Sequence, residues 1–137
     1  GAAGTTWSAA NRRDRESQLI WAGTEIQKAI GRYYLAGPAG IREYPRQLSD
    51  LLEDRRGALL QRHLRRIYLD PMTGKADWEL LRTPDGAMVG VASVSTQQPV
   101  KKAGFPTALK GFAGASCYCE WRFVYRAPAV RGDLQLP

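Results

Sequence analysis

NRRDRESQLIWAGTEIQKAIGRYY, from Asn11 to Tyr34, is the stretch of sequence that decides the fold of this chain. It contains no proline, and its apolar residues recur at spacings of three and four, as on one face of an α-helix. Polar and charged side chains fill the positions between them. The apolar core face consists of Leu19, Ala22, Ile26, Ala29, Ile30 and Tyr33. The pattern predicts one long helix that packs on an apolar surface.

Two glycines, Gly23 and Gly31, lie within the predicted helix. Each costs about 1 kcal/mol relative to alanine in a helix interior. Burial contributes roughly 1.5–3 kcal/mol for each large aliphatic side chain. Packing rather than intrinsic propensity must therefore hold this helix, and Gly37-Pro38-Ala39-Gly40 then ends it.

Short helical pieces and a turn are predicted next. A second helical pattern has Pro45 in its first turn, where a missing N–H does no harm. After Gly57, the segment from Ala58 predicts one or two further short turns of helix. The apolar positions of these two patterns are Leu48, Leu51, Leu52, Leu59, Leu60, Leu64 and Ile67. Asp70 to Lys75 holds the proline and glycine of a turn.

Beyond that turn the sequence pattern changes from helical to alternating. Trp78 to Arg82 and Met88 to Ser95 predict two strands, joined by a hairpin turn with a strong Asp-Gly signal. Gln97 to Ser116 is rich in glycine and proline and predicts a surface loop with some local structure. A third strand follows, with alternating aromatic residues that face the long helix. These expected sheet-core residues are Trp121, Phe123 and Tyr125.

This order of elements defines an α+β domain: a long N-terminal helix packed on a small three-stranded antiparallel sheet, with a short helical segment between. The length of 137 residues fits one domain, which we expect to span residues 5–137. Gly1-Ala2-Ala3-Gly4 is typical of a cloning remnant, so an anchoring segment that precedes it in the native protein is expected to be missing. Ala127 to Pro137 is typical of a loose tail.

The formal net charge of +7 is compatible with nucleic acid, with an anionic membrane surface, or with solubility alone. We favour solubility, because acidic residues are scattered through the same segments. The sequence contains no run of about 18 apolar residues that would span a membrane, and no signal peptide.

Both cysteines lie in Cys117-Tyr118-Cys119. A disulfide across one intervening residue is expected to be strained, and two cysteines without a nearby histidine make a poor zinc site. We favour two unpaired small residues on one side of a strand or turn. A labile disulfide, or pairing between molecules, is the alternative.

Residues suited to catalysis are scarce, and we predict that the chain is not an enzyme. The single histidine, His63, lies among arginines without an evident orienting partner, so a capping or surface role is expected. Asp50, Glu53 and Asp54 span one helical turn and indicate a solvated helix face. The sequence contains no phosphate loop, dinucleotide fingerprint or calcium loop. We therefore expect no cofactor and no metal.

A group of arginines supports a rival interpretation, in which the chain binds nucleic acid through its phosphate backbone. The group consists of Arg55, Arg56, Arg62, Arg65 and Arg66. Against it, these arginines point to different sides of a helix, and the aromatic strand is expected in the core.

Several segments carry motifs in a recognisable order: Arg15 to Tyr34, Tyr44 to Leu52, Arg62 to Gly74, Trp78 to Leu80, Val89 to Ser93 and Trp121 to Tyr125. The first resembles the second half of the long N-terminal helix of bacterial type IV pilin-like proteins. Tyr44 to Leu52 and Arg62 to Gly74 are similar to the "YP…L..L" and "YL…DP.TG" pattern of the major pseudopilins of type II secretion systems. The remaining segments resemble the strands that close those domains.

The resemblance implies a structural subunit of a type II secretion pseudopilus or of a type IV pilus-like fibre. A methylated apolar helix, absent from this chain, would anchor it in the bacterial inner membrane with its head in the periplasm. Its partners would be further copies, other pilin-like subunits and the inner-membrane secretion machinery. The residues expected to be exposed where the helix leaves the head, and to contact neighbouring subunits, are Arg12, Arg13, Asp14, Arg15 and Glu16.

The chain departs from this family in one loop. Calcium-binding major pseudopilins hold an ion in an acidic loop before the final strand, whereas here Lys101, Lys102 and Lys110 accompany a single acid, Glu120. A lysine-rich loop repels a cation, so we expect no calcium. Whether the subunit is major or minor stays open. The alternative function is a minor pilin-like subunit that binds DNA during uptake, which salt-dependent DNA binding would distinguish.

Overall fold

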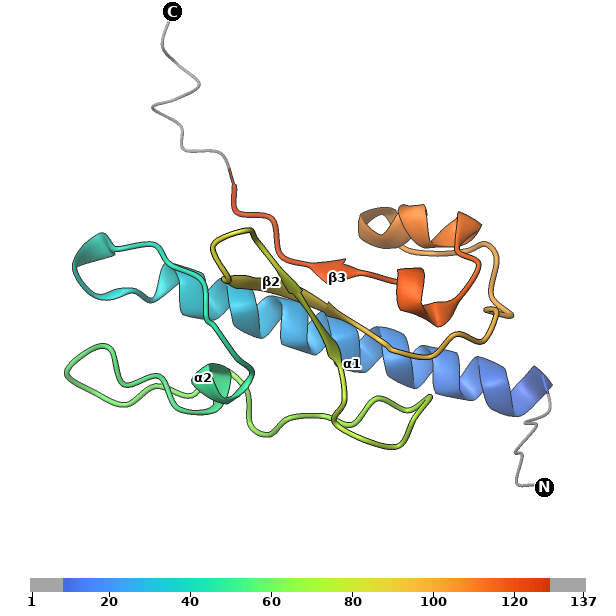
Figure 1. Cartoon of the computed structure of the whole chain (residues 1–137), viewed down its shortest axis with the longest axis horizontal. Coiled ribbons are helices and arrows are strands. Elements are labelled where there is room, and N and C mark those ends of the chain that lie inside the picture. The colour runs from blue at the N-terminus through green and yellow to red at the C-terminus, as the bar shows by residue number, and fades with distance from the viewer. Residues whose placement is uncertain (1–8, 129–137) are drawn as a thin grey trace, which may run out of the picture.

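α1 (Ala9–Leu35), the predicted long helix, has 27 residues and runs along most of the length of the molecule (Figure 1). The structure is a computed structural model that describes residues 9–128. The helix ends where expected: Gly37 has an extended conformation (φ −59°, ψ 137°) and Pro38 follows it, so the right-handed helix cannot continue. Ala39 and Gly40 then adopt positive φ values of 58° and 74°.

The elements after α1 are short. They are η1 (Pro38–Gly40), α2 (Ser49–Leu52), β1 (Glu79–Arg82), β2 (Met88–Ala92), η2 (Thr107–Gly114), η3 (Tyr118–Glu120) and β3 (Phe123–Val124). The strands form one antiparallel sheet in the order β1-β2-β3. Leu80 pairs with Val91, which pairs in turn with Phe123. The predicted α+β class and layout are confirmed.

The core lies between α1 and the sheet. Leu19, Ile26 and Ile30 are fully buried, and Ala22 and Tyr33 are almost so, at 3% and 8% exposed. Opposite them lie Trp121 and Phe123, both fully buried, together with Met88 and Val91 of β2. Tyr125 is only half-buried, at the edge of this core.

Gly23 and Gly31 allow α1 to lie directly on aromatic rings. A methyl group on Gly23 would overlap the ring of Phe123, and one on Gly31 would lie 2.6 Å from the ring of Tyr125. Both contacts would be much shorter than an ordinary van der Waals contact between carbon atoms. Each glycine lowers the intrinsic stability of the helix. This loss is offset by the close packing of helix and sheet that the missing side chain permits.

The prediction of helix from Ala58 onwards is wrong. Residues 57–60 form a projecting loop, and the backbone of Asp54 pairs with that of Gln61 as an isolated antiparallel bridge. The amides of His63 and Leu64 then donate to the carbonyl of Leu51. These pairings to α2 occupy the backbone groups that a helix would need.

Three further boundaries differ from prediction. α2 starts only at Ser49, because the carbonyl of Pro45 accepts a hydrogen bond from Met88 N at 2.8 Å and holds that residue beside β2. β2 ends at Ala92 instead of Ser95, where the Ser93 hydroxyl turns to Asp70. β3 is two residues long, so Trp121 lies outside it, after η3.

The turn from Asp70 to Lys75 is present as predicted, closed by a backbone bridge between its end residues, with Gly74 at φ 74°. The predicted tail from Ala127 lies almost entirely outside the described residues.

Gly23→Ala is expected to destabilise the protein, although alanine is the better helix former. The added methyl must displace Phe123 in a packed core, which costs about 1–3 kcal/mol and exceeds the propensity gain of about 1 kcal/mol. Urea unfolding measures the change. Gly111→Ala is the control, since a methyl there meets no atom within 4 Å. If Gly23→Ala were as stable as this control, the proposed close approach would be wrong.

Candidate assembly surface

The five charged residues predicted for subunit assembly do not share one environment. Arg13 and Asp14 are exposed, while Arg12 and Arg15 are partly buried. Glu16 is only 1% exposed. The expectation that Glu16 faces neighbouring subunits is therefore wrong, because its side chain points into the head.

Glu16 anchors the loop after β2 to the helix. Its carboxylate accepts hydrogen bonds from the backbone N–H of Val100 at 2.6 Å and of Lys101 at 3.1 Å, and from the hydroxyl of Tyr118 at 2.7 Å. A buried carboxylate is costly unless donors satisfy it, and three donors do so here. The charge is a structural clamp between α1 and a segment more than 80 residues away.

Tyr118 is held as the donor in this clamp. Burial, followed by the hydrogen bond to Glu16, raises the pKa of Tyr118 to about 12, so its hydroxyl keeps its proton at neutral pH. Arg12 adds a hydrogen bond to the carbonyl of Gln98 and lies 5.8 Å from the centre of the Tyr118 ring. Arg12 thus binds its own head.

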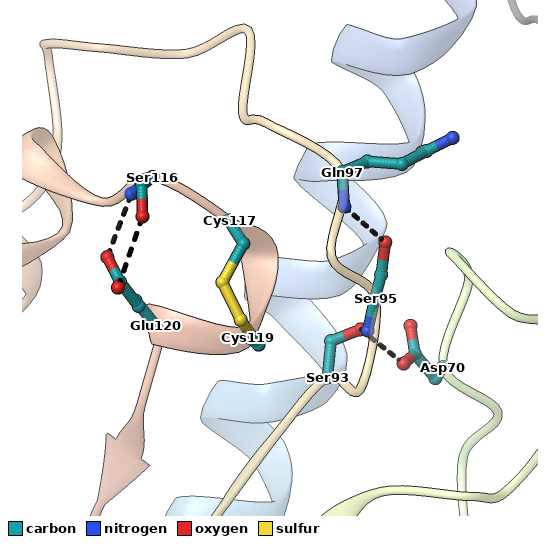
Figure 2. The surroundings of a disulfide bond; sticks show 8 residues. All are labelled: Asp70, Ser93, Ser95, Gln97, Ser116, Cys117, Cys119 and Glu120. Atoms are coloured by element: carbon teal, nitrogen blue, oxygen red, sulfur yellow. Dashed lines mark hydrogen bonds between the residues drawn. A yellow bond between two sulfur atoms is a disulfide. The ribbon is translucent and has the colours of Figure 1, made fainter.

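A disulfide joins Cys117 and Cys119 on either side of Tyr118 (Figure 2). The preference for unpaired thiols was wrong. Cys117 is extended, but the 3₁₀ turn that begins at Tyr118 brings the two Cα atoms to 5.1 Å, within the usual range for a disulfide.

The disulfide-bonded turn also pairs with the segment after β2. The amides of Tyr118 and Cys119 donate to the carbonyls of Gln97 and Ser95 at 3.0 and 3.1 Å. Figure 2 shows these two segments side by side, with Glu120 folded back onto Ser116. The turn therefore presents Tyr118 to the helix.

The position of Glu16 along the helix could have indicated that its carboxylate is buried. Glu16 lies three residues before Leu19, so it continues the apolar face of the helix by one further position. A charged residue in line with a core face indicates a buried, satisfied carboxylate. Its position within a run of charged residues had suggested exposure instead.

A second buried charge cluster ties the loop at 55–60 to the other end of α1. His63 is 7% exposed, so the expected capping or surface role is wrong. Its Nε2 lies 2.8 Å from Asp54 Oδ2 and donates to it, since an ionised carboxylate can only accept. Arg56 donates to both oxygens of Asp54 and to the carbonyl of Tyr33.

This cluster has the geometry of a structural ion pair. The guanidinium of Arg56 lies 3.5 Å from the centre of the Tyr33 ring. Its hydrogen bonds, more than those of His63, hold the pKa of Asp54 well below its usual range. Asp50, Glu53 and Asp54 do not share a solvated helix face, because Asp54 is buried beyond the end of α2.

The five arginines of the predicted basic group are likewise divided. Arg56 is mostly buried against Asp54, and Arg55 pairs with Glu53 at 2.9 Å. Arg62, Arg65 and Arg66 are exposed. They lie in an irregular segment rather than on a helix, so the expectation that they point to different sides of a helix does not apply.

Within residues 9–128, no three His, Cys, Asp or Glu side chains lie close enough together to hold a metal ion. Nor does any helix in this part of the chain have the length and apolar character needed to cross a bilayer.

Comparison of the chain with models of protein families, with curated proteins and with solved structures finds no match.

Glu16→Gln should lower the free energy of unfolding by about 1.5–3 kcal/mol, the range for hydrogen bonds to a charged group. The amide cannot accept from all three donors, and its NH₂ faces backbone N–H groups. Urea unfolding measures the loss, and amide hydrogen exchange at Val100 and Lys101 should speed up. Asp14→Asn, at an exposed position on the same helix, is the control and should change stability by less than about 0.5 kcal/mol.

Asp54 should make stability depend on pH in the acid range. Its pKa is lower in the folded protein than the ordinary value of about 4. Its stabilising effect is thus present above that value and is lost as pH falls towards the lowered pKa. Urea unfolding of the wild type and of Asp54→Asn should show a large difference near pH 6 that shrinks below about pH 4. A difference that stayed constant across this range would contradict the argument.

Proposed function

We propose that this chain is the globular head of a pilin-like fibre subunit, of the kind found in type II secretion pseudopili. Its role is structural, without turnover. In the full-length protein, an apolar helix that precedes this chain would anchor it in the bacterial inner membrane before assembly and would pack with its neighbours in the fibre. The head would then lie in the periplasm.

The observation that carries the proposal is the attachment of α1 to the head along its whole length. Glu16 clamps its N-terminal half, Gly23 and Gly31 seat it on β3 and the residue after it, and Arg56 binds the carbonyl of Tyr33 near its C-terminal end. A subunit that polymerises through a helix must transmit force from that helix to the head. A helix fixed at four levels suits this task.

The turn at Asp70 also supports the resemblance, because its motif has a structural role. Asp70 is fully buried and accepts hydrogen bonds from the Ser93 hydroxyl at 2.6 Å and from Met72 N at 2.8 Å. Burial raises the pKa of Asp70, although the bond from Ser93 opposes the shift. Asp70 thus connects the turn to the end of β2 through Ser93. This is the structural role of the first residue in the Asp-Pro-Met-Thr-Gly sequence.

The disulfide between Cys117 and Cys119 fits the same proposal. Disulfides persist in oxidising compartments, the bacterial periplasm among them, and are rare in the cytosol. A periplasmic head can keep this bond.

The gene upstream of Thr5 gives a direct test. It should encode a short basic leader, a glycine cleavage site and then about 20 apolar residues, with a glutamate near their start. Loss of secretion or of fibres in a deletion strain should be restored by the full-length gene. A gene without such an apolar segment would overturn the proposal.

Arg13 and Asp14 remain as the exposed charges at the start of α1 that can set the register between subunits. Arg13→Glu in the full-length subunit changes a side chain that is 58% exposed but lies 3.8 Å from the carboxylate of Glu16. Thermal unfolding of the head must therefore first show that this variant still folds. Fibre yield, measured by shearing and immunoblotting, should fall severalfold. Lys102→Glu, a charge reversal on the exposed loop after β2, is the control and should keep wild-type yield. Equal yields from both variants would remove Arg13 from the assembly surface.

A further inference from the structure

A recess of about 610 Å³ opens beside the N-terminal half of α1. Trp21 and Ser17 of the helix line one side, and Tyr68, Leu69 and Gly74 line the other. We call this the Trp21 recess. Its walls hold two of the most exposed large apolar side chains in the described residues, since Trp21 is 53% and Leu69 is 57% exposed.

Two of the side chains or segments that line the recess are held in place by contacts with other residues of the head. Trp21 meets the ring of Tyr68 edge-on at 4.8 Å, and the backbone carbonyl of Tyr68 accepts a hydrogen bond from Trp78 Nε1 at 2.7 Å. A preformed hollow with an exposed tryptophan has the composition of a binding hot spot.

An apolar projection lies elsewhere on the same chain. Leu59 is 78% exposed and Leu60 is 42% exposed, in the loop at residues 55–60. We call this the Leu59 loop. Its base is closed by the backbone bridge between Asp54 and Gln61 and held by the buried bonds of Asp54 to Arg56 and His63. The loop is thus presented on a fixed base, which lowers the entropy cost of binding.

The recess and the loop lie on the same side of α1 but at different levels along it. In Figure 1 the loop, in green, projects at the end of the head where α1 finishes, and the yellow-green turn that walls the recess lies towards the other end. The loop base contacts Tyr33 through Arg56, whereas the recess is at Trp21. At 1.5 Å per helical residue these levels are roughly 18 Å apart.

We propose that the Leu59 loop of one copy of this chain inserts into the Trp21 recess of the next copy. Projection and recess are different surfaces, so the contact is head-to-tail and repeats from copy to copy, as in a fibre. It covers the exposed apolar side chains of both sites at once. The inference rests on the proposed function, and it names the contact between neighbouring globular heads that would accompany packing of the helices.

The polar rims of the two sites also match. Arg65 and Arg66 stand beside the recess, and no carboxylate within residues 9–128 pairs with either. In the same part of the chain, the carbonyls of residues 57–60 accept no backbone hydrogen bond. Guanidinium groups are donors and carbonyls are acceptors, so the tip of the loop, at residues 57–60, can accept from these arginines through its backbone. The loop's own Arg55 and Arg56 are paired with Glu53 and Asp54.

Sedimentation velocity on the 137-residue chain tests the contact, at concentrations up to about 1 mM because small interfaces between proteins are weak. The wild type should self-associate. Leu59→Asp damages the loop and Leu69→Asp damages the recess, and each alone should weaken association at least tenfold. A one-to-one mixture of the two variants should form a dimer and nothing larger, since one intact loop and one intact recess remain.

Ile41→Asp, at another exposed apolar position (56% exposed), is the control and should associate like the wild type. Thermal unfolding of each variant excludes a folding defect as the cause. A duplex of about 20 base pairs serves as the competing probe, because its phosphates would also attract Arg65 and Arg66.

Three results would overturn the inference. They are a wild type that stays monomeric, association that Leu59→Asp abolishes and Leu69→Asp does not, and binding of the DNA duplex at the recess by monomeric protein. Fibres formed in cells by a full-length Leu59→Asp subunit, together with monomeric heads in solution, would remove this contact and leave the proposed function standing. A gene without an upstream apolar helix would remove the function, whatever sedimentation showed.

Discussion

The close approach of α1 to β3 is the constraint on which the rest of the head depends. Because Gly23 has no side chain, the ring of Phe123 lies directly on the helix backbone. Phe123 in turn packs edge-on against Phe112 at 5.2 Å, and Phe112 stacks on Trp121 at 5.4 Å. A chain of aromatic contacts thus leads from the helix through β3 to η2. Any shift of the helix away from β3 would open a gap beneath all of these rings.

Two buried charge clusters fix the position of α1 within this packing. Apolar contacts alone leave a helix some freedom to slide or rotate, because one aliphatic side chain can replace another. Glu16 and Asp54 remove that freedom, since each is costly to bury unless its donors are in place. Glu16 finds its donors in the loop after β2, and Asp54 finds Arg56, which reaches the carbonyl of Tyr33. Each cluster ties a loop without regular structure to one half of the helix.

The sequence predicted the elements that follow a regular local pattern and missed particular contacts, some of them between distant residues, that leave no trace in such a pattern. The helical period of α1, its end at Gly37 to Gly40 and the Asp-Gly turn before β2 are local patterns, and all three are present. The burial of Glu16 needs Val100, 84 residues away. The Leu59 loop lies where a helix was predicted, because Gln61 pairs with Asp54 and the amides of His63 and Leu64 donate to Leu51 instead of continuing a helix. Sequence periodicity holds no information on such partners.

The placement of apolar surface follows from the same division. The face of α1 towards the sheet is filled by core residues, so it has nothing left to offer a partner. The segment between α1 and β1 is mostly irregular, and its helices η1 and α2 have three and four residues. That segment leaves Trp21 and Leu69 half-exposed and projects Leu59 into solvent. The contact proposed between copies uses these side chains, because they are apolar groups that the packing of α1 on the sheet leaves exposed.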